Sequence, residues 1–524
     1  MDADSTAPAL DDDDGEAGDW GPFGRPLFDD PSARALSRVG VVDVGSNSVR
    51  MVVFDGAARS PAYFFNEKIM CGLGKGLAQT GRLHPEGKAR ALSALKRFSL
   101  LAKGMQVSPF TVVATAAVRE AEDGAAFQEQ VLRETGLKLH VIDGAEEARL
   151  SAQGVLLGWP EAKGIVCDIG GNSMELARIA EGRVGKRVST PLGPFRLQQI
   201  EGGPKKRKAH IDAVLSAAAR AIRPEGDRIY LVGGSWRVIA RLDMERRSYP
   251  LTVLHEYRMT PEGLMDTLDW LATADLAALR GRTGTSAERM ELVPLACEVL
   301  REIVRVLKPS SIDVSSYGIR EGLLYEQMPA RLRARDPLIE AARMTELTQA
   351  RIPGFGKKLF LFLEPLFKGV TEDRLRLIKA ACLLHDTTWR AHPDYRAEAC
   401  FDNATRANLG GLDHPGRVFL GLALLHRYKN SRAGSRMEPL FRLLPEEDIA
   451  QAEVLGKAMR FGAMFAVGDP AEAGELRWQP KKRQLVLSLT EQGVGLFGEV
   501  AQTRFASLAQ AMKAEAKVAL RAEE

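Results

Sequence analysis

The sequence predicts an α/β protein in which two lobes repeat each other, followed by a mostly α-helical C-terminal region. The main observation is a repeated stretch, because Gly40–Arg50 reads GVVDVGSNSVR and Gly164–Glu175 reads GIVCDIGGNSME. In each copy a β-branched run stops at Gly and small polar residues and then resumes as a second apolar run. This pattern is typical of a strand, a tight turn and a strand. Further strands and crossover helices follow both copies, which predicts two α/β layers that face each other.

The two turns are candidate anion sites. A turn of Gly, Ser and Asn leaves backbone N–H groups unobstructed, and consecutive N–H groups form a concave site for an anion. Asp43 and Asp168 end the preceding strands at matched positions, where a carboxylate can hold a hard cation against the same anion. Either copy alone is better explained as an ordinary hairpin, but matched acids in a duplicated chain favour phosphate binding. No Gly-Lys-Ser/Thr follows either turn, so neither is a Walker loop.

Composition indicates a soluble, multidomain protein. At 524 residues the chain is too long for one core, which predicts three or four domains. Hydrophobic residues make up 45% and charged residues 27%, and no apolar run approaches the roughly 18 residues that span a bilayer. The acidic N-terminus fits neither a signal nor a transit peptide, and the five cysteines have no metal-type spacing. A reducing, cytoplasmic location is therefore expected, and the net charge of +4 permits an anionic ligand.

Four segments are expected along the chain: a disordered acidic tail at residues 1–35, lobe I at 36–160, lobe II at 161–329 and a helical region at 330–524. The expected strands of the two lobes are Val39–Val44, Val49–Phe54, Ala62–Met70, Phe110–Ala114, Leu137–Ile142, Gly164–Asp168, Met174–Ile179, Arg183–Thr190, Arg228–Val232 and Ser311–Val314. In the C-terminal region, helices are expected over Leu338–Tyr428 and Pro445–Val467, one strand over Leu485–Leu489, and a long final helix over Leu496–Ala522.

Seven motifs occur in order through residues 39–328: VDVGSNSVRMVV (42–53), TAAVRE (115–120), IDGAEEARLSAQGV (142–155), CDIGGNSMEL (167–176), PLGPFRL (191–197), LVGGSW (231–236) and YGIREGLLY (317–325). Together with the duplicated hairpins, they resemble the exopolyphosphatase/guanosine pentaphosphate phosphohydrolase (Ppx/GppA) family. The resemblance implies two actin-like (ribonuclease H-like, ASKHA) ATPase-type lobes. It also implies a helical C-terminal domain that resembles a degenerate HD fold.

The resemblance assigns the general base to the second glutamate of its motif, which is Glu147 here. From the residues alone, Asp143 caps a helix and the helix dipole favours acids in the first turn, which explains Glu146 and Glu147 equally well. A positioned Glu can deprotonate a water late in a loose phosphoryl transfer. The resemblance directs Arg119 at the terminal phosphate, and Arg50 is a second such donor, since a planar fork of N–H groups suits a phosphoryl group. Without the resemblance, Arg119 is an ordinary surface ion pair.

Mg²⁺, or Mn²⁺ in its place, is the expected cofactor. Asp168, to which the resemblance assigns the metal, and Asp43 would hold it directly or through water, because Mg²⁺ takes one or two carboxylates plus phosphate oxygens. The expected phosphate-binding residues are those of the two turns: Gly45, Ser46, Asn47, Ser48, Gly170, Gly171, Asn172 and Ser173. Most relatives have Gly where this chain has Asn172, and Asn tolerates positive φ better than other non-glycine residues.

A third Gly-rich turn consists of Gly233, Gly234 and Ser235, ahead of a predicted helix. In related folds this turn touches a nucleotide, but Trp236 replaces the family's usual small residue. The turn is therefore a secondary candidate.

Basic residues outside the hairpins are also secondary candidates. Arg196 in PLGPFRL and Arg320 in YGIREGLLY can bind phosphate, although arginines at such places often only tie loops together. Lys205–Lys208 is a basic run before a predicted helix. A solvated helix start explains this run better than a rail for the later phosphates of a long polyanion.

The C-terminal region contains a His385-Asp386 pair, then His392, His414 and His426. Such a pair on a helix is compatible with a metal phosphohydrolase. However, no histidine lies between residue 330 and His385, where such a site would need its first ligand. Packing and polar contacts therefore explain these residues better, and the resemblance implies a non-catalytic domain that bounds a channel or a dimer contact.

These observations predict a Mg²⁺-dependent hydrolase that releases terminal orthophosphate from inorganic polyphosphate. The alternative substrate is guanosine pentaphosphate, cut at its 5′-terminal phosphate. Alternatives of other classes are a non-catalytic regulator that binds guanosine phosphates and an acceptor kinase of the same fold. The resemblance implies a homodimer, and neither nucleic acid nor membrane is an expected partner.

Overall fold

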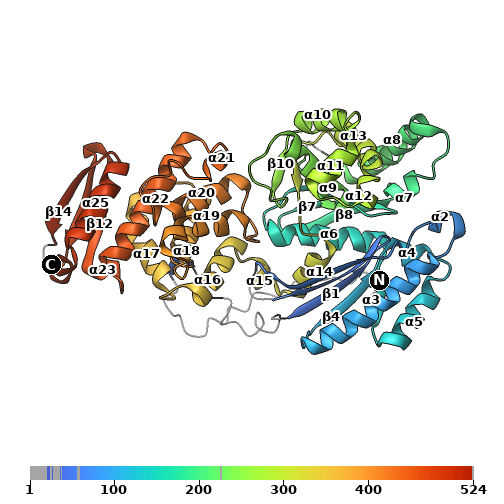
Figure 1. The fold of residues 1–524 in the computed structure, drawn as a ribbon, viewed down its shortest axis with the longest axis horizontal. Helices are drawn as coiled ribbons and strands as arrows, with labels where there is room; N and C mark the ends of the chain where they lie inside the picture. Colours follow the sequence, from blue (N-terminus) through green and yellow to red (C-terminus); the bar gives the residue numbers. More distant parts are fainter. Residues whose placement is uncertain are drawn as a thin grey trace.

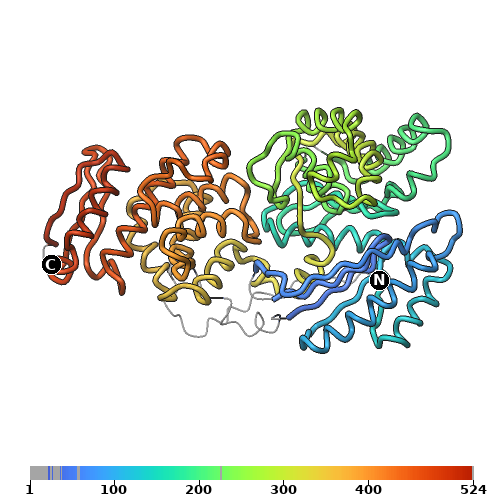
Figure 2. The backbone as a smooth tube through the Cα atoms, viewed as in Figure 1, coloured from blue at the N-terminus to red at the C-terminus, as the bar shows by residue number. Residues whose placement is uncertain are grey.

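The computed structural model describes residues 21–23, 26, 36, 38–55, 59–224 and 227–521. Two α/β lobes lie one above the other at one end of an elongated molecule, and a helical domain and a small α/β domain extend from them (Figure 1). The backbone trace runs through lobe I, lobe II, the helical domain and the last domain in sequence order (Figure 2).

Lobe I contains a five-stranded sheet in the order β3-β2-β1-β4-β5. Its strands are β1 (Val39–Val44), β2 (Ser48–Phe54), β3 (Tyr63–Met70), β4 (Phe110–Ala114) and β5 (Leu139–Val141). Its helices are α2 (Leu77–Thr80), α3 (Pro85–Gly104), α4 (Ala116–Glu120), α5 (Gly124–Thr135) and α6 (Gly144–Gly158). The first three strands are antiparallel, and β4 and β5 continue parallel to β1.

Lobe II repeats this arrangement as β8-β7-β6-β9-β11, with β10 added antiparallel at the edge. Its strands are β6 (Gly164–Ile169), β7 (Met174–Ala180), β8 (Arg183–Thr190), β9 (Ile229–Gly233), β10 (Tyr257–Met259) and β11 (Ile312–Val314). Its helices are α7 (Pro194–Leu197), α8 (Gly203–Ile222), α9 (Gly234–Arg246), α10 (Pro261–Leu271), α11 (Leu276–Thr283), α12 (Ala287–Met290), α13 (Val293–Leu307) and α14 (Ile319–Gln327). The duplicated actin-like fold is therefore confirmed.

Two helices, α6 and α14, pack together between the lobes and complete an apolar core shared by both sheets. Two glycines allow this close contact: a Cβ on Gly322 would lie 1.8 Å from the Leu150 carbonyl oxygen, and one on Gly154 would lie 2.2 Å from that of Gly318. Since α6 carries Glu147, this contact fixes the position of the predicted base relative to both sheets.

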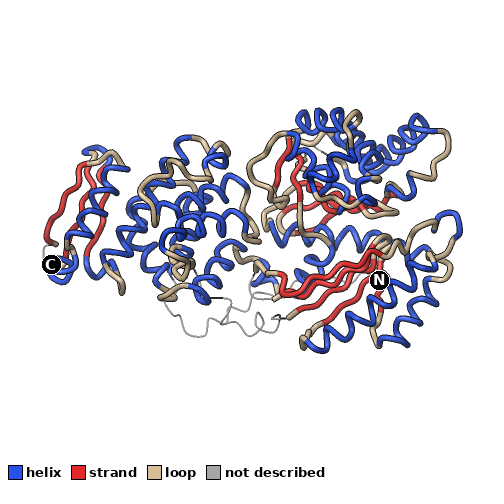
Figure 3. The backbone as a smooth tube through the Cα atoms, viewed as in Figure 1, coloured by secondary structure: helices blue, strands red, loops and turns tan. Residues whose placement is uncertain are grey.

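The C-terminal region contains two domains rather than a continuous helical array (Figure 3). The helical domain consists of α15 (Ala330–Arg333), α16 (Pro337–Gln349), α17 (Phe355–Leu363), α18 (Glu372–Leu384), α19 (Arg396–Arg406), α20 (His414–His426), α21 (Glu438–Phe441) and α22 (Glu446–Phe465). The last domain has a sheet in the order β12-β13-β14, formed by Gly474–Gln479, Gln484–Leu489 and Glu515–Leu520, with α23 (Pro470–Ala473), α24 (Glu491–Leu496) and α25 (Glu499–Ala511). The predicted resemblance to an HD fold stays a prediction.

One local prediction is wrong. The expected final helix ends at Ala511, because the chain reverses at Lys513, whose φ is 53°, and then pairs with β13 as β14. The Ala-, Glu- and Lys-rich composition favours helix, but strand pairing overrides this weak preference. The expected disordered tail lies outside the described residues except at 21–23 and 26. There, Phe23 is buried against Phe360 of the helical domain, with ring centroids 5.4 Å apart.

The helical domain contacts lobe II through buried polar groups. The Leu412 N–H donates to Oε1 of Glu256 at 3.0 Å, and the Tyr249 hydroxyl lies 3.0 Å from Nδ1 of His414. Burial raises the pKa of Glu256 to about 8. No helix within the described ranges combines the length and apolarity needed to cross a membrane.

We expect Gly322→Ala to destabilise the protein, because the added methyl group would overlap the α6 backbone. Overpacking of this kind costs about 1–3 kcal/mol. The control is Gly281→Ala on α11, where a Cβ meets nothing within 4 Å and where we expect a gain of roughly 0.5–1 kcal/mol. Thermal unfolding midpoints of both variants test this, and equal midpoints would contradict the role of the contact.

We expect the stability of the junction to depend on the protonation of Glu256. Because its pKa rises from 4.5 to about 8 on folding, its contribution is complete below about pH 4.5 and is lost as pH rises through about 8. Glu256→Gln keeps an acceptor for the Leu412 N–H without the charge, so its unfolding midpoint should fall less between pH 5 and pH 9 than that of the wild type. The exposed Glu129→Gln should follow the wild type.

Candidate active site

The two hairpin turns have the same internal structure and lie against each other. The Gly45 N–H donates to the Ser48 carbonyl at 3.0 Å, and the Gly170 N–H donates to the Ser173 carbonyl at 2.9 Å. A Cβ on Gly171 would lie 3.2 Å from that of Ser46, so the lobe II turn meets the lobe I turn directly.

The turns offer unused donors. Among the described residues, the backbone N–H groups of Ser46, Asn47, Gly171 and Asn172 make no hydrogen bond to the protein. Buried N–H groups are rarely left unpaired, because each costs free energy comparable to a lost hydrogen bond. These groups are therefore suited to an anion seated between the lobes.

Cross-strand register places charged side chains in two matched rows. In lobe I, Asp43 on β1 is opposite Arg50 on β2, which is opposite Lys68 on β3. In lobe II, Asp168 on β6 is opposite Glu175 on β7, which is opposite Ser189 on β8. Each lobe thus keeps one aspartate at the matched position. The other two residues of the row are cationic in lobe I, whereas in lobe II one is an acid and the other is neutral.

Helix α6 presents Glu147 to this cleft. Asp143 caps the helix as predicted, since its side chain accepts the Glu146 N–H at 2.7 Å. Glu146 accepts hydrogen bonds from Arg149 at 2.5 and 2.8 Å, which explains this residue structurally. Glu147 is only 5% exposed and has no such helix partner, so the structure separates the two glutamates that the sequence left equivalent.

Burial and neighbouring charge raise the pKa values of the carboxylates in the cleft. Burial raises the pKa of Glu147 well above its ordinary value, and the charges of Glu175, Asp168 and Asp43 raise it further. Burial and Asp168 raise the pKa of Glu175 to about 8. Burial also raises the pKa values of Asp43 and Asp168, although the Ser151 hydroxyl donates to Asp168.

Three arginines face these acids. Nη1 of Arg119 lies 3.4 Å from Oε2 of Glu147 and donates to the Ile142 carbonyl at 2.8 Å. Arg50 donates to the Asn66 side chain at 2.8 Å and lowers the pKa of Asp43. Arg320 is 9% exposed, its Nε has no partner within the described chain, and its charge lowers the pKa of both Asp43 and Asp168.

The remaining predicted residues divide between the cleft and its rim. Gly233, with φ of 114°, approaches so closely that a Cβ would lie 3.1 Å from Oδ1 of Asp168, which brings the third turn (Gly233–Ser235) into the site. Arg196 instead forms an ion pair with Glu120 of lobe I. The basic run is tied to α13, since Arg207 pairs with Glu298 at 2.7 Å and Lys208 with Glu302 at 3.6 Å.

Sequence reasoning missed two residues of the cleft. Glu175 is buried, and its Oε2 has no partner within the described chain. The repeat could have identified it, because it occupies the position that Arg50 has in the first copy. Arg237 follows the third turn and lowers the pKa of Asp168, while donating to the carbonyls of Ser315 and Ser316 at 3.2 and 3.0 Å.

The donor set fits a hard divalent cation. The orphaned Glu175 oxygen and the raised pKa values of its neighbours indicate negative charge without enough compensation. Within the described ranges, no three His, Cys, Asp or Glu side chains converge as a complete metal site. Mg²⁺ does not require one, because it keeps waters and takes one or two carboxylates together with phosphate oxygens.

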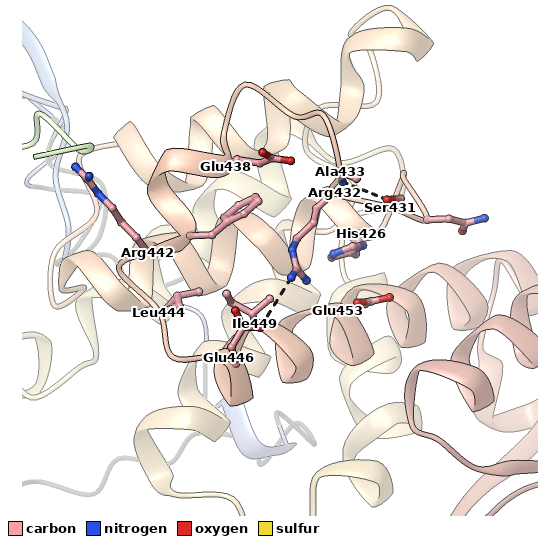
Figure 4. Close-up of a pocket in the computed structure, with 12 residues that line it drawn as sticks. His426, Ser431, Arg432, Ala433, Glu438, Arg442, Leu444, Glu446, Ile449 and Glu453 are labelled. Atoms are coloured by element: carbon pink, nitrogen blue, oxygen red, sulfur yellow. Dashed lines mark hydrogen bonds and ion pairs between the residues drawn. The ribbon is translucent and has the colours of Figure 1, made fainter. Parts of the chain in front are cut away.

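Two cavities lie away from this cleft. One of about 550 Å³ in the helical domain is lined by residues that include His426, Arg432 and Glu453 (Figure 4). There, Nδ1 of His426 lies 3.3 Å from the Lys429 carbonyl, and Arg432 pairs with Glu446 at 4.0 Å. Another, of about 840 Å³, lies between lobe II and the helical domain.

His385 and Asp386 make contacts within the helical domain. His385 Nδ1 lies 2.8 Å from the Cys382 carbonyl, and Asp386 accepts two hydrogen bonds from Arg351, at 2.6 and 2.8 Å. These contacts agree with the predicted structural interpretation of the pair.

The duplicated lobes and their cleft of acids, arginines and free N–H groups define an actin-like protein that handles phosphoryl groups. The sequence profile described as "Ppx/GppA phosphatase family" matches residues 52–331, and that described as "Exopolyphosphatase, C-terminal" matches residues 338–519. The chain therefore belongs to the Ppx/GppA phosphatase family, which makes it a hydrolase.

Individual relatives are distant. "Exopolyphosphatase 1" of Mycobacterium leprae is 26% identical over 304 residues, covering 56% of this chain and 89% of that protein. "Retrograde regulation protein 2" of Saccharomyces cerevisiae is 25% identical over 506 residues, covering 86% of this chain and 80% of that protein. The structure of an exopolyphosphatase from Cytophaga hutchinsonii superimposes with a TM-score of 0.49 at 24% identity, covering 55% of this chain and 96% of the other. The structure of an Aquifex aeolicus Ppx/GppA phosphatase superimposes with a TM-score of 0.47 at 23% identity, covering 56% of this chain and 99% of the other.

Proposed function

We propose that this protein is a Mg²⁺-dependent exopolyphosphatase that removes terminal orthophosphate from inorganic polyphosphate. The observation that carries the proposal is one cleft that joins buried carboxylates to an Arg320 Nε and turn N–H groups that have no partner among the described residues. The exopolyphosphatase relatives support the substrate class.

The side chains suggest a division of labour. Glu147 accepts a proton from water as the water attacks the terminal phosphorus, and its raised pKa makes it a stronger base once nearby positive charge keeps it ionised. The phosphoanhydride bond breaks, and the shortened chain leaves with the bridging oxygen. Arg119, Arg320 and the turn N–H groups stabilise the charge on the phosphoryl oxygens. Mg²⁺ on Asp168 and Asp43 would supply positive charge against those oxygens.

We expect Glu147→Gln to lower kcat by about 10²–10⁴-fold with little change in KM, because a positioned base contributes this much. Glu146→Gln is the matched control, because the carboxylate of Glu146 pairs with Arg149 instead of facing the cleft. This variant should keep kcat within a few-fold of the wild type. Phosphate release from long-chain polyphosphate, with Mg²⁺ and with chelator, measures both. Full turnover by Glu147→Gln would exclude Glu147 as the general base. Full turnover in the presence of chelator would exclude a requirement for Mg²⁺.

Guanosine pentaphosphate is the alternative substrate, with the same chemistry at its 5′-terminal phosphate. Phosphate release from both substrates under identical conditions decides between them. A kcat/KM that is higher for guanosine pentaphosphate would reassign the substrate and leave the mechanism intact.

A regulator that binds guanosine phosphates without catalysis is the alternative of another class, favoured by the yeast relative's name and by its match across most of this chain. Tight nucleotide binding without phosphate release would support it. An acceptor kinase would require a hydroxyl substrate, whereas the proposed hydrolase works with water alone. The homodimer belongs to the same proposal, and light scattering in solution tests it.

A further inference from the structure

Strand β3 exposes a row of side chains beside the site. Along this strand Phe64, Asn66, Lys68 and Met70 are exposed, while the alternate residues are half-buried. Asn66 accepts the hydrogen bond from Arg50, and Lys68 is opposite Arg50 in the strand register. Since residues directly opposite each other on neighbouring strands share a face of the sheet, Lys68 extends the lobe I row of Asp43 and Arg50.

A cation of lobe II acts on the same position. Lys68 is exposed, yet its pKa falls to about 8, first through desolvation by the surrounding protein and then through Arg289, Arg50 and Arg320. Arg289 lies on α12 and is itself influenced by Arg241, with no acid among the groups that act on it. Within the described chain, neither Lys68 nor Arg289 forms an ion pair or a side-chain hydrogen bond.

This arrangement is unfavourable unless an anion joins it. Like charges at close range destabilise a folded protein, and surface lysines and arginines commonly find carboxylate partners. Here Lys68 lies opposite Arg50 in the strand register, and the charge of Arg289 in lobe II also acts on Lys68; we call Arg50, Lys68 and Arg289 the cation row. A solvated surface would explain a single exposed lysine, but it does not explain convergence on one face next to a phosphate site.

The row has a direction. Neighbouring strands are about 4.8 Å apart, so the step from Asp43 on β1 to Lys68 on β3 spans roughly 10 Å. Its inner end adjoins the acids at which the terminal phosphate would react, and its outer end carries the charges of Lys68 and Arg289. A ligand that follows the row is therefore an extended polyanion with its end at the acids.

We propose that Lys68 and Arg289 bind the phosphates that follow the terminal one in a linear polyphosphate and thereby set the enzyme's preference for long chains. This inference rests on the proposed function and specifies its substrate. Lys68 suits the task because an ammonium is a compact point charge that accepts a phosphate in any orientation, so a sliding chain is not held in one register. Short substrates end before the outer part of the row.

The test is the double variant Lys68→Met/Arg289→Gln, assayed with long-chain polyphosphate and with tripolyphosphate. We expect KM for long chains to rise about 10-fold, equivalent to about 1.4 kcal/mol, with kcat within about 2-fold and tripolyphosphate kinetics nearly unchanged. The effect should shrink at high salt, because exposed charges are screened. Lys68→Arg should restore most of the affinity. The matched control is Lys103→Met/Arg133→Gln, which removes the same charges from exposed positions on α3 and α5.

Two outcomes would overturn the inference while leaving the proposed function in place. One is an unchanged KM for long chains, and the other is an equal rise for tripolyphosphate, which would place these cations at the reacting phosphate. Calorimetric titration of long-chain polyphosphate into Glu147→Gln, with and without the double substitution, separates the two proposals. If the wild type releases no phosphate, the proposed function is wrong. The role of the cation row is then tested by binding alone, and it is wrong if the double substitution does not weaken the binding of long-chain polyphosphate.

Discussion

The structure depends on the repulsion among carboxylates that the fold buries in one cleft. Burial raises the pKa of Glu147, Glu175, Asp168 and Asp43, and the charges of the other three raise the pKa of Glu147 further, so ionisation of the whole set is unfavourable. Burial of such charge is costly unless opposite charge approaches it. The nearby Arg320 provides some, although its Nε has no partner among the described residues. The proposed cation and phosphate chain would compensate both the acids and the arginines, which is the kind of preorganisation that phosphoryl transfer needs.

This asymmetry arises within a symmetric fold. The two sheets share strand order, hairpin register and turn hydrogen bonds, which indicates that the backbone requirements of the turn are the same in both lobes. The side chain seven residues after the aspartate differs, being Arg50 in one lobe and Glu175 in the other. Because the two faces meet across the cleft, this exchange makes the lobe I face more cationic and the lobe II face more anionic.

The parts of the site that sequence could predict are those set by local rules. The hairpin turns, the Asp143 cap and the matched acids follow from turn chemistry, capping and repetition. Arg149, three residues after Glu146, is a local signal that favours pairing with Glu146, whereas the burial of Glu147 depends on long-range packing that the sequence does not show. The prediction of a long final helix is wrong for a related reason. The pairing of Glu515–Leu520 with β13 is a long-range contact that outweighs the helix preference of this segment. Phe23 likewise gains its position from a core that lies far along the chain.

The contacts that join the lobes differ in strength from one side of the cleft to the other. On one side, the glycine contacts of α6 and α14 leave no room between backbones and bury a shared apolar core. Near the turns, the lobes are joined by Arg196 and Glu120, a partly exposed ion pair of the kind that contributes little to stability. The helix pair and its apolar core therefore contribute more to holding the lobes together than the ion pair near the turns does. Glu147 lies on α6 itself, so the stronger of the two contacts fixes its position.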